Sequence, residues 1–225
     1  MKYLIGNWKA NKNLSEVEEW FRVIASLYIS KKKDWSDNLV VVVCPPFIYL
    51  EQAKRLVKKY NLPFKLGTQD ISPYDNGAFT GEVTARQIKE FAEFVLIGHS
   101  ERRKNFKESD DMLAEKVKQA NGFRLQIVYC VPDEKAVIPE GVSIVAYEPV
   151  WAIGSGQTDT PENAGRIAST IKKDNNIKSV IYGGSIKPEN IAGFWESVFL
   201  DGVLPGGSSL NADSFWQMIL HATAI

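Results

Sequence analysis

The stretch SIVAYEPVWAIGSGQTDTP (residues 143–161) contains one complete structural unit of this chain. Its apolar run 144–147 is typical of a buried strand, and the carboxylate of Glu148 follows where that strand ends. A loop with glycines at 154 and 156 then leads to Thr160 and Pro161, a helix N-cap followed by proline at the first helical position. The stretch therefore predicts a strand, a loop and a helix in succession.

The same unit recurs along the whole chain. Short β-rich runs, each followed by a polar turn, occupy residues 3–7, 39–44, 64–69, 94–98, 124–130, 143–147, 179–184 and 201–205. Continuous apolar runs of this kind indicate strands that are covered on both faces, as in a parallel sheet. Strands that alternate with helices in this number predict an α/β fold with a closed (β/α)8 barrel, and an open doubly wound sheet is the alternative. Since no linker interrupts the pattern, we expect a single domain over residues 1–225.

Helical patterns fill most of the gaps between the predicted strands. The first begins at Ser15, for which Glu18 would complete a capping box, and it places Val17, Trp20 and Phe21 on one face. The gap at 131–142 is the exception, because it is too short for a full helix and two turns. We therefore expect the outer helix between the fifth and sixth strands to be vestigial or missing.

The composition limits the classes of function. The chain has 27 Lys and Arg against 27 Asp and Glu, so no net positive charge draws it to nucleic acid or to an anionic membrane. Its two cysteines, Cys44 and Cys130, lie far apart and form no disulfide framework, which favours a reducing compartment. No apolar run approaches the ~20 residues of a membrane span. We expect a cytoplasmic enzyme or binding protein.

Polar residues recur at the predicted strand ends, where barrels carry their reactive groups. Glu148 could be a general base, because partial desolvation by apolar neighbours makes a carboxylate more basic, or it could be a cap or ion-pair partner. His99 precedes a short helix, which favours neutral imidazole, although a structural histidine is the alternative. Lys9 could stabilise an oxyanion, although most lysines are solvated.

Two glycine pairs follow the seventh and eighth predicted strands, in YGGS (182–185) and PGGSS (205–209). Barrels often bind phosphate at this place with backbone N–H groups, and glycine lets the backbone approach the oxygens closely. One such pair would indicate a turn, whereas two at neighbouring strand ends indicate a phosphate site. The loop 150–160 has the composition of a lid that could close over Glu148.

Together these segments resemble the triosephosphate isomerase family. The matching stretches are GNWKANK (6–12), GAFTGE (77–82), IGHSERR (97–103), YEPVWAIGSG (147–156) and YGGSIKPEN (182–190), with a DG-L-GG-SL pattern in 201–210. The resemblance implies a TIM barrel that interconverts dihydroxyacetone phosphate and D-glyceraldehyde 3-phosphate in glycolysis and gluconeogenesis, without cofactor or metal. Members of this family are well known to use a glutamate as the base beside a neutral histidine.

The resemblance also implies roles for individual residues. Glu148 would move the proton, His99 would polarise the carbonyl oxygens and Lys9 would supply positive charge. Asn7 would help to fix the substrate oxygens, and Glu101 would be a supporting carboxylate near Lys9. The substrate-binding positions would be Asn7, Lys9, Gly154, Ser185, Gly206 and Gly207. The family is typically a homodimer, so we expect the loop 69–82 to reach a second copy, with Thr80 beside the partner's site.

The chain departs from the family's pattern in four places. Cys130 is followed by Val131-Pro132-Asp133 and a truncated connection, Pro205 precedes the second glycine pair, and Asp70 stands where asparagine is common. At the exit of the predicted lid, Gln157-Thr158-Asp159 replaces the common lysine and alanine at the first and third positions. Since hinge residues absorb the backbone change, we expect Gln157 and Asp159 to alter lid opening.

Two other functions compete with the isomerase. Another phosphate-handling barrel enzyme, such as an aldolase or an isomerase of tryptophan or histidine synthesis, would share the glycine pairs but would not need HSER or EPVWAIG. A non-catalytic phosphate-sensing protein on a decayed barrel is the third reading. Decay would have struck at least one of Lys9, His99 and Glu148, and all three are present.

Overall fold

The computed structural model describes residues 1–31, 35–152 and 157–223. Within these ranges, eight parallel strands close into a barrel in sequence order, with β8 pairing back to β1. The strands are β1 (Lys2–Asn7), β2 (Leu39–Cys44), β3 (Phe64–Thr68), β4 (Phe94–Ile97), β5 (Gln126–Val131), β6 (Ile144–Tyr147), β7 (Ser179–Tyr182) and β8 (Gly202–Val203). The (β/α)8 TIM barrel is therefore confirmed, and the doubly wound sheet is excluded.

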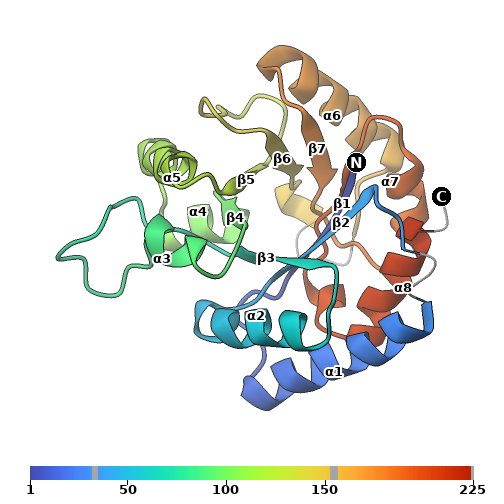
Figure 1. Ribbon diagram of the computed structural model, residues 1–225. Coiled ribbons are helices and arrows are strands. Elements are labelled where there is room, and N and C mark those ends of the chain that lie inside the picture. Colours follow the sequence, from blue (N-terminus) through green and yellow to red (C-terminus); the bar gives the residue numbers. More distant parts are fainter. Residues whose placement is uncertain (32–34, 153–156, 224–225) are drawn as a thin grey trace.

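Helices surround the barrel on the outside (Figure 1). They are α1 (Leu14–Lys31), α2 (Leu50–Lys59), α3 (Ala85–Lys89), α4 (Ser100–Phe106), α5 (Asp110–Gly122), α6 (Pro161–Asn175), α7 (Ile191–Glu196) and α8 (Ala212–Thr223). Short 3-10 turns are η2 (Phe47–Tyr49), η3 (Val150–Ala152) and η4 (Gly207–Ser209). None of the helices in the described ranges is long and apolar enough to cross a membrane.

The continuous apolar runs are explained by two separate cores. Side chains alternate along each strand, so Val42 and Cys44 of β2 point into the barrel while Val41 and Val43 point toward the helices. The inner cluster fills the barrel with residues such as Leu96, and the outer cluster joins the strands to the helices. Apolar side chains therefore lie on both faces of most strands, which is why strict alternation is missing from the sequence.

The start of α1 corrects one prediction. Asn13, and not Ser15, caps the helix: its Oδ1 accepts from the Glu16 backbone N–H at 3.0 Å, and Glu16 Oε2 accepts from the Asn13 N–H at 2.7 Å. This is the reciprocal pattern of a capping box, two residues earlier than Ser15 and Glu18. Asparagine is as good an N-cap as serine, and Ser15 instead donates its hydroxyl to Asn13 Oδ1. The predicted cap Thr160 is confirmed, since its side chain accepts from the Asn163 backbone N–H.

The connection between β5 and β6 contains no helix. Residues 132–143, all of which the structure describes, form turns and irregular chain, whereas every other pair of consecutive strands is joined by a helix (Figure 1). Ala136 and Ile138 pack against the outer core in its place, and Val142 is buried. The prediction of a missing outer helix is therefore confirmed, and a loop covers the strands there.

Candidate active site

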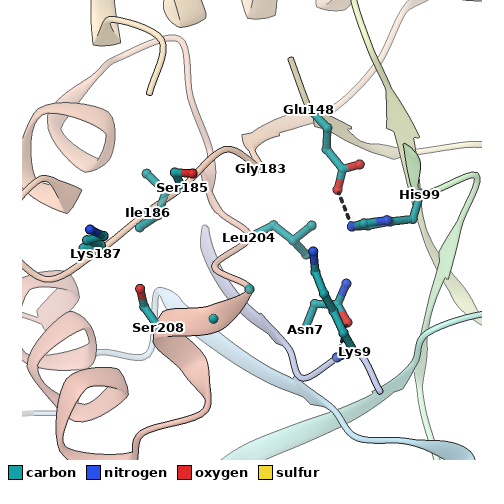
Figure 2. A pocket seen from close by; sticks show the side chains of 12 residues that line it. Asn7, Lys9, His99, Glu148, Gly183, Ser185, Ile186, Lys187, Leu204 and Ser208 are labelled. Carbon is teal, nitrogen blue, oxygen red and sulfur yellow. Dashed lines mark hydrogen bonds and ion pairs between the residues drawn. The ribbon is translucent and has the colours of Figure 1, made fainter. Parts of the chain in front are cut away.

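A cavity of about 220 Å³ opens at the carboxyl ends of the strands (Figure 2). Its lining comes from the ends of strands 1, 4, 6, 7 and 8 and consists of Asn7, Lys9, His99, Glu148, Gly183, Ser185, Ile186, Lys187, Leu204, Gly206, Gly207 and Ser208. Seven of the predicted site residues are in this set, so the fold brings together positions that lie far apart in the sequence. The remaining predicted positions are considered below.

Glu148 is held in a narrow place at the end of β6. Its side chain is 1% exposed, and its backbone N–H donates to the Val131 carbonyl at 2.8 Å. Its Oε2 faces the Ser100 backbone N–H at 3.4 Å, and Oε1 lies 3.5 Å from His99 Nε2 without a hydrogen-bond partner in the described chain. The carboxylate is therefore shielded from solvent, and its hydrogen bond to the Ser100 N–H is long. Its oxygens are thus available to accept a proton from a substrate.

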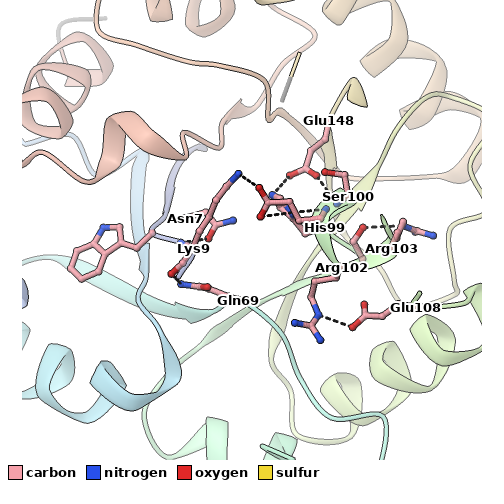
Figure 3. Close-up of polar contacts among 12 residues, drawn as sticks. Asn7, Lys9, Gln69, His99, Ser100, Arg102, Arg103, Glu108 and Glu148 are labelled. Atoms are coloured by element: carbon pink, nitrogen blue, oxygen red, sulfur yellow. Dashed lines mark hydrogen bonds and ion pairs between the residues drawn. The ribbon is translucent and has the colours of Figure 1, made fainter. Parts of the chain in front are cut away.

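His99 is fixed by the helix that follows it. It is the N-cap of α4, and its Nδ1 accepts from the Glu101 backbone N–H at 3.2 Å. An imidazole nitrogen that accepts a hydrogen bond carries no proton, so this contact assigns the neutral tautomer with the proton on Nε2. That N–H points toward Glu148 (Figure 3). The histidine can therefore donate a hydrogen bond into the cavity without being charged.

Lys9 has an unusual backbone that its neighbours hold in place. Its φ is +52°, in the left-handed region that a non-glycine residue seldom adopts. Its N–H donates to Asn7 Oδ1 at 3.0 Å, and its carbonyl accepts from Gln69 Nε2 at 2.9 Å. Its Nζ pairs with Glu101 Oε1 at 2.5 Å (Figure 3). The ammonium is therefore presented to the cavity by a positioned backbone and an anionic partner.

The glycine-rich loops form the other end of the cavity. A Cβ on Gly207 would meet nothing within 4 Å, and one on Gly206 would come 3.3 Å from the stem of Lys9. Ser185 has a φ of +32°, a second strained backbone at the rim. This end therefore exposes backbone to the cavity, as an anion site requires. The fourth predicted phosphate position, Gly154, lies outside the described residues, as does much of the predicted lid (153–156).

The exit of the lid carries a hydrogen-bond network that the sequence did not reveal. Asp159 is buried; its Oδ2 accepts from the Tyr147 hydroxyl at 3.0 Å, and its N–H donates to the Tyr182 hydroxyl at 2.8 Å. Asn163 Nδ2 also donates to Oδ2, at 2.8 Å. Burial, together with the charge of Asp159, raises the pKa of Tyr147, and the same causes raise the pKa of Tyr182 to about 12.

Five residues of the cavity wall were not among the predicted site residues: Gly183, Ile186, Lys187, Leu204 and Ser208. Leu204 could have been found from the alternation along the eighth strand, which turns it inward. Lys187 comes two residues after Ser185 in the same loop, so its place in the phosphate-binding motif was the available signal.

Thr80 lies away from the cavity, on the loop that joins β3 to α3. This loop extends from the barrel (Figure 1), and Thr80 is exposed on it. Tyr74 and Phe79 stack on the same loop with ring centroids 4.2 Å apart, yet remain 45% and 42% exposed. An ordered loop with two exposed aromatic rings is a feature that protein–protein contacts commonly use.

The fold and the cavity define a class: a (β/α)8-barrel enzyme in which a dry carboxylate, a neutral imidazole and an amine surround a space for a small anionic substrate. A family model described as triosephosphate isomerase matches residues 2–222. Proteins named triosephosphate isomerase are 34% identical to this chain in Mesomycoplasma hyopneumoniae strain 7448 (98% of this chain, 99% of that protein) and in Alkaliphilus metalliredigens (96% and 97%). The one from Dictyoglomus turgidum is also 34% identical, over 97% of this chain and 98% of its own length. The chain belongs to the triosephosphate isomerase family.

Proposed function

We propose that this chain interconverts dihydroxyacetone phosphate and D-glyceraldehyde 3-phosphate, with Glu148 as the base that moves the proton. Membership of the family supplies the reaction and its place in glycolysis and gluconeogenesis. The observation that carries the assignment of the base is the pairing of a dry carboxylate with a neutral imidazole, 3.5 Å apart on one cavity that Lys9 also lines.

The proposed mechanism uses each group for one task. Glu148 removes a proton from the carbon next to the carbonyl, and the electrons move onto the carbonyl oxygen to give an enediolate. His99 donates its Nε2–H to that oxygen, and the Lys9 ammonium stabilises the negative charge. The hydroxyl proton of the neighbouring oxygen passes by way of His99 to the former carbonyl oxygen, so the neighbouring oxygen becomes the new carbonyl. At the same time Glu148 returns its proton to the former carbonyl carbon, which completes the aldose–ketose exchange. The Lys9–Glu101 contact and the Asn7 amide keep the ammonium in position.

The phosphate of the substrate is proposed to bind at the glycine-rich end. Ser185, Gly206 and Gly207 would hold its oxygens from strands 7 and 8, and Gly154 would join them from the predicted lid. In this pose the reacting carbons would lie near His99 and Glu148, which line the other end of the cavity (Figure 2). Holding the phosphate also retains the enediolate, which in an open site would expel its phosphate.

Glu148→Asp tests the assignment of the base. The shorter side chain retracts the carboxylate by ~1 Å, which should lower kcat on the order of 100-fold with KM nearly unchanged. Steady-state kinetics in both directions would measure this. Unchanged kcat would remove Glu148 from the role of base, and His99→Gln should separately slow turnover if the imidazole polarises the carbonyl.

We propose a homodimer of single-domain subunits in the cytoplasm. The projecting loop with Tyr74 and Phe79 supports contact with a second copy, in which Thr80 would lie beside the partner's cavity. The buried, unpaired thiols of Cys44 and Cys130 fit a reducing compartment. Sedimentation of the purified protein at micromolar concentration should give twice the 25.2 kDa chain mass, and a mass of one chain would refute the dimer.

A further inference from the structure

Lys187 is a cation at the phosphate end of the cavity to which neither the motifs nor the mechanism give a role. It lies with Ser185 and Ser208 at the end of the cavity remote from His99 and Glu148 (Figure 2). Its backbone N–H donates to Asn190 Oδ1 at 2.8 Å, which fixes the chain where the side chain departs. Its side chain is exposed, and its ammonium has no hydrogen-bond or ion-pair partner among residues 1–31, 35–152 and 157–223.

The charges around the cavity give this ammonium a task. Lys9 is neutralised by Glu101 at 2.5 Å, Glu148 is an anion, and the neutral tautomer of His99 adds no charge. Without Lys187, the charged groups on the cavity wall and their partners in the described chain sum to minus one. A phosphate monoester carries nearly two negative charges at neutral pH, so these side-chain charges alone would oppose its entry. Lys187 brings the sum to zero and adds a positive charge to the lining at the phosphate end of the cavity.

We propose that Lys187 recruits the phosphate group of the substrate, as a phosphate-binding residue outside the proton-transfer machinery. The inference rests on the proposed function for the identity of the substrate. The ligand is a dianionic phosphate ester or free phosphate, and the Lys187 side chain binds it in addition to the backbone N–H groups. A charge at this end acts on entry and binding, so its removal should lower kcat/KM and leave kcat nearly unchanged.

The test compares Lys187→Gln, Lys187→Arg and Lys187→Glu with a matched control. Lys178→Gln removes an exposed lysine just before β7, at the opposite end of the strand that leads to Lys187. At ~10 mM ionic strength, where screening extends over about 30 Å, Lys187→Gln should lower kcat/KM roughly 5- to 10-fold and weaken competitive inhibition by inorganic phosphate to a similar degree. Lys187→Arg should restore both kcat/KM and the inhibition by phosphate. Lys187→Glu should lower kcat/KM and weaken the inhibition further.

Salt supplies a readout that a structural defect would not change. At ~0.3 M ionic strength the difference between wild type and Lys187→Gln should shrink to about 2-fold, because screening weakens the attraction. Equal kcat/KM and equal phosphate inhibition in the two proteins at low salt would overturn the proposal, as would a loss confined to kcat or an equal loss in Lys178→Gln.

The proposal and the function on which it rests can fail separately. Calorimetric titration with inorganic phosphate measures binding without turnover, so it tests Lys187 even if wild type did not interconvert the two trioses. Wild-type activity with unchanged phosphate binding in Lys187→Gln would refute only the role of Lys187. Inactive wild type that binds phosphate through Lys187 would refute only the isomerase.

Discussion

At the scale of single residues, the site depends on what surrounds Glu148. Its Oε1 is a buried acceptor without a partner in the described chain, and such a group costs about 1–3 kcal/mol. Because no donor occupies this oxygen, it is free to face a substrate in the cavity. The side chain is confined as well, because a Cβ on Gly183 would lie 2.8 Å from Glu148 Cγ. Only glycine at 183 therefore leaves the carboxylate where it is.

Gly183→Ala tests this confinement. The new methyl group should push the carboxylate out of line with His99 and lower kcat on the order of 10- to 100-fold, since a displacement of ~1 Å can have that effect. Gly122→Ala is the control, because a Cβ there would meet nothing within 4 Å and the position lies at the end of α5. Kinetics and thermal unfolding would be measured on both variants. Full activity in Gly183→Ala would show that the contact is not restrictive.

The sequence predicted residues that stand at strand ends within specific motifs, such as Lys9, His99 and Glu148. It did not predict residues whose importance comes from a neighbour in space. Asn13 was passed over as a cap because Ser15 is equally suited by type, and only the contacts of Glu16 decide between them. The absence of a partner for Lys187 likewise depends on the folded loops, so no pattern in the sequence could show it.

At the scale of elements, the hinge after the predicted lid is tied to two strands. Asp159 joins Tyr147 at the end of β6 to Tyr182 at the end of β7, and both tyrosines directly precede residues of the cavity, Glu148 and Gly183. The sequence placed Asp159 at a hinge but could not supply its partners, which come from neighbouring strands. The effect of Gln157 and Asp159 on lid opening stays a prediction.

Asp159→Ala tests the hinge. It deprives the Tyr147 hydroxyl of its buried acceptor, which should lower the free energy of unfolding by about 1–3 kcal/mol. Because hinge changes often alter kcat and KM together, both should shift, by roughly 10-fold in kcat/KM. Asp174→Ala, an exposed carboxylate on the same helix α6, is the control. In a Tyr147→Phe background the stability loss should be smaller, and strictly additive losses would argue against the Tyr147–Asp159 bond.

At the scale of the whole molecule, the same network makes stability depend on alkaline pH. Burial raises the pKa of Tyr182 to about 12, whereas an unfolded tyrosine titrates near 10. Between these values the unfolded chain releases the phenolic proton and the folded chain keeps it. The stability from this group is therefore complete below pH ~10 and is lost as the pH rises through about 12.

Urea unfolding between pH 9 and 11.5 would measure this loss. One such phenol should steepen the decline in the free energy of unfolding by about 1.4 kcal/mol per pH unit. Tyr182→Phe should flatten the decline while lowering stability at pH 7, because the Asp159 N–H loses its acceptor. Tyr60→Phe, at the end of α2 and outside the network, should keep the wild-type slope. An identical slope in Tyr182→Phe would contradict the assignment.

The interrupted ring of helices at 132–143 divides the chain into two unequal parts. The first part ends with β5 and carries Lys9 and His99, whereas the second begins with β6 and carries Glu148 and both glycine-rich loops. Neither part contains all the residues that line the cavity. The two parts are joined through the β5–β6 and β8–β1 strand pairings. A polypeptide cleaved within this bare connection would keep every strand intact, so its catalysis would report directly on the reassembly of two fragments.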